Sequence, residues 1–214
     1  MQLEQDILKG NDEVAAHVRH HLREQHTTAL NVVSSPGSGK TTLLVATLQR
    51  LAGGRPLAVI EGDQHTSLDA ERIRATGVAA VQINTGKGCH LDARMVHDAL
   101  HDLPPLKGGV LFIENVGNLV CPAGFDLGEQ ARVLMFSMTE GEDKPLKYAD
   151  MFATADLVLL SKADLLPHLH FDVERARKLI ALVNPDARVL QVSATTGEGM
   201  DGWLDFIDSR CALA

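Results

Sequence analysis

Basic residues are scarce in this sequence of 214 residues, and so are cysteines and aromatic residues. Only 20 lysines and arginines stand against 28 aspartates and glutamates, which gives a formal net charge of −8. A surface that binds nucleic acid normally shows a basic patch, so we expect no nucleic-acid partner.

The three cysteines, Cys89, Cys121 and Cys211, are too few and too scattered for a disulfide framework, which is typical of a protein from a reducing compartment. No apolar run is long enough to span a bilayer, and no basic-then-apolar leader is present. We therefore expect a cytoplasmic protein with no membrane insertion. With 45% hydrophobic residues, a chain of this length can bury a substantial core without disulfides.

Residues 1–28 are polar and predict an N-terminal helical segment that carries four histidines, His17, His20, His21 and His26. His17 and His21 are four residues apart and would share a helical face. We favour a solvated helix with incidental histidines, and metal binding by this cluster stays as the alternative.

From Ala29 onward, short apolar runs alternate with helical patterns. The runs predict strands at 29–34, 57–61, 80–83, 110–114, 131–136, 157–161 and 188–192, and the helical patterns fall at 41–51, 68–75, 91–100, 171–183 and 200–211. Because the runs are too continuous to have a solvated face, they indicate a parallel sheet covered on both sides. The sequence predicts one α/β domain over residues 29–214, with a doubly wound, mainly parallel sheet of about seven strands and ligands at the carboxyl ends of those strands.

The stretch Asn31-Val-Val-Ser-Ser-Pro-Gly-Ser-Gly-Lys-Thr-Thr-Leu-Leu44 is predicted to form a strand, a tight glycine-rich loop and the start of a helix. This is the layout of a phosphate-binding P-loop, G-x-x-x-x-G-K-[ST], with Ser34 in place of the first glycine. Backbone N–H groups and the helix N-terminus would hold the phosphates, Lys40 would reach the β- and γ-phosphates, and Thr41 would bind Mg²⁺. The residues expected at the nucleotide are Pro36, Gly37, Ser38, Gly39, Lys40, Thr41 and Thr42. The alternative, a Gly/Ser-rich turn before an ordinary helix, explains less of the pattern.

Acidic residues follow two later strands, as a nucleotide site requires. Asp63 ends one strand and is placed to hold Mg²⁺ or to orient the attacking water, and Glu114 ends another, near Mg²⁺. Gly117 lies three residues on, where its backbone N–H would contact the γ-phosphate. Lys40, Asp63 and Glu114 are therefore the candidate catalytic residues, and Thr41, Asp63 and Glu114 the candidate Mg²⁺ ligands. Arg72 and Arg74 are possible cationic donors, although a solvated helix face explains them equally.

The choice of base is indicated by Ser161-Lys-Ala-Asp164, which matches the guanine-reading pattern N/T-K-x-D with serine in the first position. Asp164 would accept hydrogen bonds from the guanine N1–H and amine, which adenine does not offer, and Lys162 would cover the ring. Ser193, Ala194 and Thr195 follow the last strand and are expected beside the guanine O6. A simple Lys/Asp turn before a helix is the alternative.

A second group of residues has the chemistry of a metal site. Cys89 and His90 follow the third strand and Cys121 follows the fourth; such ligands suit Ni²⁺ or Zn²⁺. Neighbouring residues of a regular strand face opposite sides, but Gly86 and Gly88 favour an irregular loop in which both side chains can reach one ion. The alternative is a buried cysteine beside a surface histidine, plus another core cysteine. Three ligands leave a tetrahedral site incomplete, which favours a site shared between two chains. Movement of Gly117 would also move Cys121.

Several segments resemble the HypB family, the GTPases that help insert nickel into [NiFe]-hydrogenase. They are Ser34 to Leu44, Glu61-Gly-Asp63, Asp69 to Ile73, Gly88 to Ala93, Glu114 to Pro122 and Ser193 to Met200, and the resemblance runs from about residue 28 to the C-terminus. It implies a SIMIBI-type P-loop GTPase and a GTP-dependent homodimer whose interface holds a metal at Cys89, His90 and Cys121. It also implies delivery of nickel toward the hydrogenase large-subunit precursor, together with a nickel-binding accessory protein of the HypA type. Turnover should be slow, because no arginine finger is evident in the sequence. No cysteine precedes Cys89, so the Cys-rich N-terminal nickel motif of some members is not expected.

Three other functions stay open from the sequence. A related maturation GTPase could serve urease or a cobalamin enzyme, a small-molecule kinase could use the same phosphate-binding loop, and a plain metal-binding or storage protein could use the cysteines alone.

Overall fold

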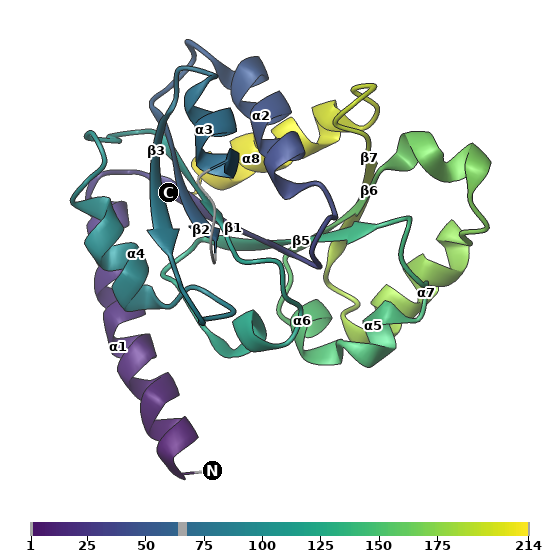
Figure 1. Ribbon diagram of the computed structural model, residues 1–214, viewed down its shortest axis with the longest axis horizontal. Helices are drawn as coiled ribbons and strands as arrows, with labels where there is room; N and C mark the ends of the chain where they lie inside the picture. Colours follow the sequence, from purple (N-terminus) through teal and green to yellow (C-terminus); the bar gives the residue numbers. More distant parts are fainter. Residues whose placement is uncertain (1, 64–67, 214) are drawn as a thin grey trace.

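A computed structural model describes residues 2–63 and 68–213 as helices packed on both sides of one central sheet (Figure 1). The seven strands pair in the order β3-β2-β4-β1-β5-β6-β7, and every pairing is parallel. The strands are β1 (Thr28–Ser34), β2 (Leu57–Asp63), β3 (Ala79–Asn84), β4 (Val110–Glu114), β5 (Ala131–Ser137), β6 (Leu157–Ser161) and β7 (Arg188–Val192). The predicted doubly wound α/β sheet is confirmed, with the predicted strands extended by at most two residues at either end.

The helices are α1 (Gln2–Glu24), α2 (Lys40–Leu51), α3 (Leu68–Arg74), α4 (Ala93–Leu100), α5 (Lys144–Lys147), α6 (Ala149–Ala153), α7 (Val173–Val183) and α8 (Met200–Cys211), with short 3₁₀ turns η1 (Cys121–Gly124) and η2 (Ala163–His168). Helices α4 and α7 each begin two residues later than predicted, because Asp92 and Asp172 act as N-caps that accept from the N–H groups of Met95 and Arg175. The sequence pattern missed α5 and α6, which are too short to show a helical period.

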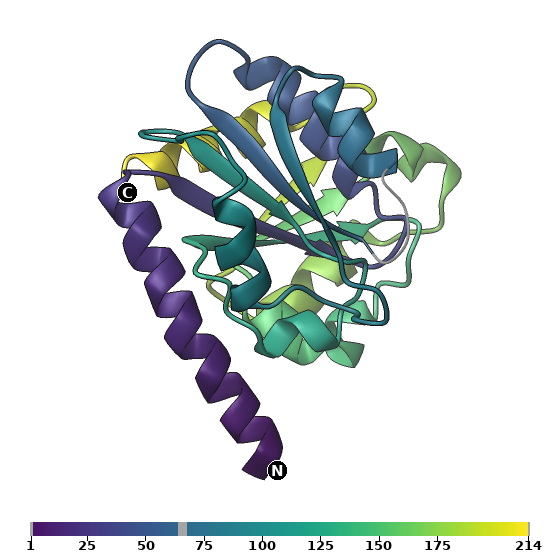
Figure 2. The same ribbon diagram turned by 60° about the vertical axis from the view of Figure 1, so that its left-hand side comes forward.

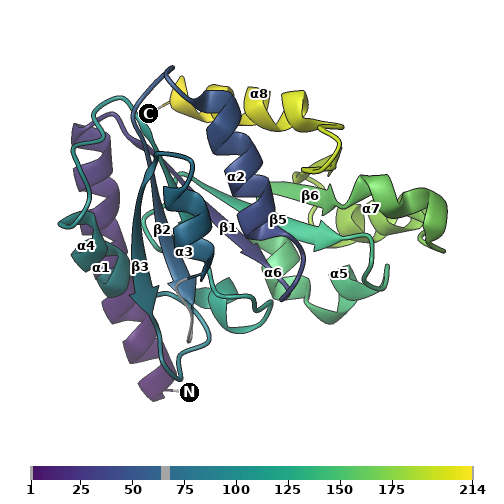
Figure 3. The same ribbon diagram turned by 45° about the horizontal axis from the view of Figure 1, so that its top comes forward.

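Two layers of helices cover the sheet (Figure 3). On one face, Leu44 and Leu48 of α2 and Trp203 of α8 pack against strand residues such as Phe112 and Val133. The other face is covered by two groups of helices: α6 and α7 pack over β5 and β6, and α1 and α4 pack over β2 and β4. Burial of both sheet faces explains why the strands are apolar along their whole length.

Helix α1 lies along the edge of the body, and its N-terminal part extends beyond the rest of the protein (Figure 2). Its C-terminal half contributes Val18 and Leu22 to the core over β4. Polar contacts hold it in place: Arg19 pairs with Asp126 at 2.6 Å, and Asn11 donates to the Asp126 carbonyl and accepts from the N–H of Ala93. Among the described residues, none of the helices combines the length and apolar character needed to cross a bilayer.

Candidate functional site

The loop between β1 and α2 has the geometry that its sequence predicts. Gly37 and Gly39 adopt φ values of 74° and 94°, which only glycine adopts without strain, and α2 begins at Lys40. Ser34, in place of the usual glycine, is fully buried. Its hydroxyl donates to the Ser35 carbonyl at 2.6 Å and accepts from Lys40 Nζ at 3.0 Å. The Ser34 hydroxyl therefore helps to hold the Lys40 side chain in position, which a glycine would not do.

A carboxylate from outside the motif holds the other side of this loop. Glu140, which follows β5, accepts at 2.8 Å from the hydroxyls of both Ser35 and Ser38 and forms an ion pair with Lys144. Burial opposes ionisation of Glu140, but the hydrogen bonds from Lys144 and the two serines bring its pKa below the usual value. Nothing in the local sequence links Glu140 to the phosphate loop, because Ser35 and Ser38 lie more than 100 residues away from it.

Two buried carboxylates face the loop. Glu114 accepts from the Thr41 hydroxyl at 2.8 Å, and Glu61 is its direct neighbour on the adjacent strand in the β2–β4 register. Both residues are almost inaccessible to solvent, and the Oε2 atom of each has no hydrogen-bond partner. Burial, reinforced by the facing Glu114, raises the pKa of Glu61 to about 8, and burial raises that of Glu114 to about 7.

Orphaned carboxylate oxygens beside a hydroxyl form a donor set that suits a hard divalent cation such as Mg²⁺. Asp63 lies two residues after Glu61 on β2, so the two side chains leave the strand on one face. Lys40 is half-buried, and desolvation lowers its pKa, although Glu114 opposes the effect. The sequence analysis selected Asp63 but missed Glu61. The signal that could have found Glu61 was its position two residues before Asp63, which places both side chains on one face of the strand.

A cavity of about 310 Å³ lies next to the phosphate loop. Its lining includes Ser38, Gly39, Thr42, Ser161, Lys162, Asp164, Ala194 and Thr195, together with the apolar side chains of Leu43, Met135 and Val192. Lys162 Nζ donates to the Gly37 carbonyl at 2.8 Å, and Asp164 accepts from the Ser193 hydroxyl at 2.6 Å. Ser161, in the position usually taken by asparagine, donates to the Ser38 carbonyl at 3.0 Å. Of the residues predicted to read the base, Lys162, Asp164, Ala194 and Thr195 thus line one cavity, and Ser193 is the hydrogen-bond donor to Asp164.

The predicted metal ligands also come together. One ligand atom each from Cys89, His90 and Cys121 lies within 4.8 Å of the others, in the only such group among the described residues. Cys89 and His90 lie in the loop between β3 and α4, outside any regular strand, and Cys121 begins η1. Cys89 Sγ lies 3.7 Å from His90 Nδ1. Cys211 ends α8 and packs against the core on the opposite face of the sheet.

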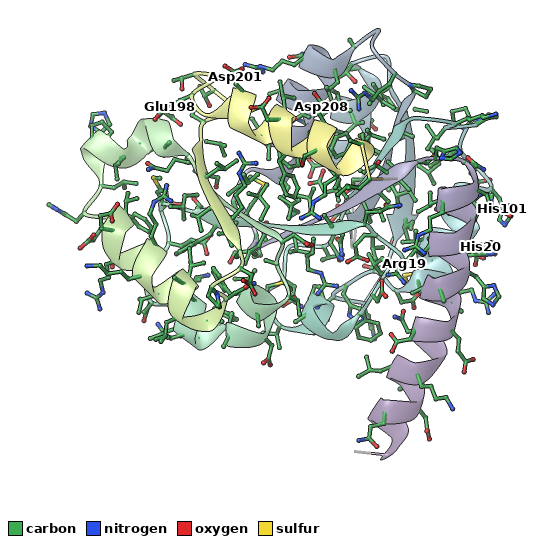
Figure 4. The ribbon with its side chains drawn as sticks, turned by 180° about the vertical axis from the view of Figure 1, so that it is seen from behind. Arg19, His20, His101, Glu198, Asp201 and Asp208 are labelled. Carbon is green, nitrogen blue, oxygen red and sulfur yellow. The ribbon has the colours of Figure 1, made fainter. Side chains whose placement is uncertain are left out.

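The chemistry of this cluster fits a borderline or soft metal ion. Hydrogen bonding with Cys121 raises the pKa of the Cys89 thiol. Burial lowers the pKa of His90, which favours the neutral ring that binds metals. The centroid of this ring lies 4.1 Å from the ring centroid of Phe125. By contrast, the four N-terminal histidines do not converge on such a group within the described residues; His20 lies on the outer surface of α1 (Figure 4) and pairs only with Glu24.

One segment, residues 114–121, joins the two sites. It begins at Glu114 and ends at Cys121. At Gly117 it passes so close to the phosphate loop that a Cβ atom would lie 2.9 Å from Pro36 Cα. Pro36, Gly117, Glu140 and Lys144 line a second cavity of about 450 Å³. Asn118 donates from its side chain to the Cys89 carbonyl at 3.2 Å.

Comparison with known proteins gives a consistent assignment. The family model for the CobW/HypB/UreG nucleotide-binding domain matches residues 28–191. The hydrogenase maturation factor HypB of Azotobacter chroococcum mcd 1 is 63% identical over 210 residues, which is 98% of this chain and 69% of that protein. The crystal structure of HypB from Archaeoglobus fulgidus superimposes with a TM-score of 0.88 at 39% identity, covering 95% of this chain and 99% of that one. HypB from Helicobacter pylori in complex with nickel gives a TM-score of 0.89 at 37% identity, covering 95% of each chain.

Proposed function

Because this chain belongs to the CobW/HypB/UreG family, and within it to the HypB hydrogenase maturation factors, we propose that it is a GTP-hydrolysing metallochaperone. In this role it helps insert nickel into the large subunit of [NiFe]-hydrogenase. The observation that carries the proposal is the connection of a Cys/His cluster to a phosphate-binding loop through the single segment 114–121.

Each part of the nucleotide site has a defined task in this proposal. The loop N–H groups and Lys40 bind the phosphates, and Asp164 selects guanine through the N1–H and amine that adenine lacks. Thr41, Glu61, Asp63 and Glu114 supply oxygen atoms for Mg²⁺, which neutralises charge on the phosphates when bound. Asp63 is also proposed to orient the attacking water. Slow turnover is part of the proposal, because Arg72, a candidate arginine finger, donates to Asp69 and Thr42 instead.

The metal site is proposed to respond to the nucleotide. A γ-phosphate that pulls on Gly117 also moves Asn118, which holds the Cys89 carbonyl, and Cys121, which is a ligand. GTP therefore favours one arrangement of the ligands and GDP another, and hydrolysis gates release of the ion. Three protein ligands leave a tetrahedral site one short, so a homodimer formed with GTP would complete it across the interface. Nickel is the proposed cargo, although zinc suits the same ligands.

The proposed partners follow from this role. A nickel-binding accessory protein of the HypA type would cooperate in loading, and the hydrogenase large-subunit precursor would receive the ion.

The test is a Ni²⁺ titration of the protein loaded with GDP and then with a non-hydrolysable GTP analogue, following the thiolate-to-nickel absorption band. We expect affinities that differ at least fivefold between the two nucleotides, and no band in Cys121→Ser. Cys211→Ser is the matched control and should behave like the wild type, because Cys211 lies on the opposite face of the sheet. Equal affinity with both nucleotides would refute the gating, and a band that survives in Cys121→Ser would refute the site.

A further inference from the structure

A buried polar network runs through the protein beneath the Cys/His cluster, and no part of the nucleotide or metal chemistry above uses it. It consists of Asn115, Asn31, Glu129 and Arg132, which we call the inner network. Asn115 follows β4, Asn31 lies in the middle of β1, Glu129 precedes β5 and Arg132 is its second residue. All four side chains are less than a tenth exposed.

The links of the inner network are continuous. The Asn115 amide donates to Asn31 Oδ1 at 3.3 Å, and the Asn31 amide donates to Glu129 Oε1 at 3.1 Å. The same carboxylate oxygen accepts from two nitrogens of Arg132, Nε at 3.3 Å and Nη2 at 3.1 Å. Asn31 and Arg132 are partners in the β1–β5 register, so the sheet itself fixes this spacing.

Each end of the network holds one arm of the metal cluster. At one end, Asn115 Oδ1 accepts from the N–H of Leu91, the residue after His90, at 3.1 Å. At the other end, Arg132 donates to the carbonyls of Ala123 at 2.9 Å and Phe125 at 2.7 Å. Ala123 lies within η1, two residues after Cys121, and the Phe125 ring lies against the His90 ring. The two loops that carry the ligands are therefore tied to one rigid interior.

Stability alone does not explain why Glu129 and Arg132 are buried together. A buried Glu–Arg pair must overcome the desolvation of both charges, and an apolar pair of similar volume would often stabilise a fold as well or better. Apart from one hydrogen bond to Thr154, the remaining N–H groups of the Arg132 guanidinium donate to loop carbonyls and not to other side chains of the core. Planar, multidentate arginine suits that task, since it fixes several acceptors in one geometry.

We propose that the inner network positions the metal ligands: Asn115, Asn31, Glu129 and Arg132 set the distance between the Cys89–His90 loop and Cys121. They do not touch the ion, so they are positioning residues. The inference rests on the proposed function only in requiring that a metal binds at this cluster. Loss of outer partners that orient metal ligands commonly weakens metal binding by about 10- to 100-fold.

The first variant is Asn31→Leu, which breaks the middle of the network without touching either ligand loop. Thr28→Val is the matched control, because Thr28 lies on the same strand and its buried hydroxyl has no hydrogen-bond partner. The second variant, Arg132→Lys, keeps the charge opposite Glu129 but cannot hold both loop carbonyls, and it serves if Asn31→Leu does not fold. Ni²⁺ and Co²⁺ affinities are measured from their thiolate absorption bands, with GDP affinity and the urea unfolding midpoint of each variant.

We expect metal affinity to fall at least tenfold in Asn31→Leu and Arg132→Lys with an altered Co²⁺ spectrum, while GDP affinity stays within about twofold of the wild type. Thr28→Val should leave all of these unchanged. Unaltered metal affinity in both variants would overturn the proposal, as would a parallel loss of GDP affinity, which indicates general damage. If the wild type itself shows no cysteine-dependent band, the proposed function fails instead, so the two failures are distinguishable.

Discussion

Replacing Glu114 by glutamine tests whether the buried carboxylate beside the phosphate loop destabilises the fold when no cation is bound there. Glu114 is 3% exposed, and burial raises its pKa from 4.5 to about 7. The folded protein therefore binds this proton more tightly than the unfolded chain. The stability that the neutral carboxyl provides is complete below pH 4.5 and is lost as pH rises toward 7, if neither Mg²⁺ nor nucleotide is present.

The size of the effect follows from the pKa. A difference of about 2.5 in pKa corresponds to roughly 3 kcal/mol between the two protonation states. Glutamine keeps an acceptor for the Thr41 hydroxyl and carries no charge, but it removes a favourable charge from beside Lys40. We therefore expect Glu114→Gln to be more stable than the wild type by about 1–3 kcal/mol at pH 8, and nearly equal to it at pH 5.

The assay is urea unfolding at pH 5, 6, 7 and 8 in EDTA without nucleotide. Glu140→Gln is the matched control with the opposite sign. Because Lys144 and the two serines hold the pKa of Glu140 below its usual value, its charge stabilises the fold at neutral pH. That variant should lose stability by a similar amount at all four pH values, because the contribution of the Glu140 charge falls only below the usual carboxyl range. A Glu114→Gln difference that is the same at pH 5 and pH 8 would refute the reasoning.

Two further predictions concern the base cavity and the core. Asp164→Asn should weaken GDP binding about 10- to 100-fold by calorimetry, because a charged hydrogen-bond acceptor is lost, and should reduce the preference for GDP over ADP; an unchanged preference would contradict the assignment of the base. Trp203→Phe should cost about 2–3 kcal/mol in urea unfolding and leave GDP affinity unchanged, because Trp203 is fully buried and its indole N–H donates to Thr47 at 2.8 Å. A cost below about 1 kcal/mol would show that the hydrogen bond and the packing contribute little there.

Much of the fold was predictable because its signals are local. Apolar runs too long for a half-solvated strand gave the seven strands, and glycines with Lys40 and Thr41 gave the phosphate loop. Helices α5 and α6 were not predicted because they span only four and five residues, which is too short for a helical periodicity to be recognised in the sequence.

The sequence by itself determined the order of the elements, the motif chemistry and the family, since each depends on residues close together in the chain. The tertiary structure alone decided that Glu61 faces Glu114, that Glu140 holds the serines of the phosphate loop, and that Asn31 and Arg132 link the two ligand loops. Those pairings depend on strand order and register, which bring together residues from distant parts of the chain. No local pattern encodes such distances, because the sheet is what sets them.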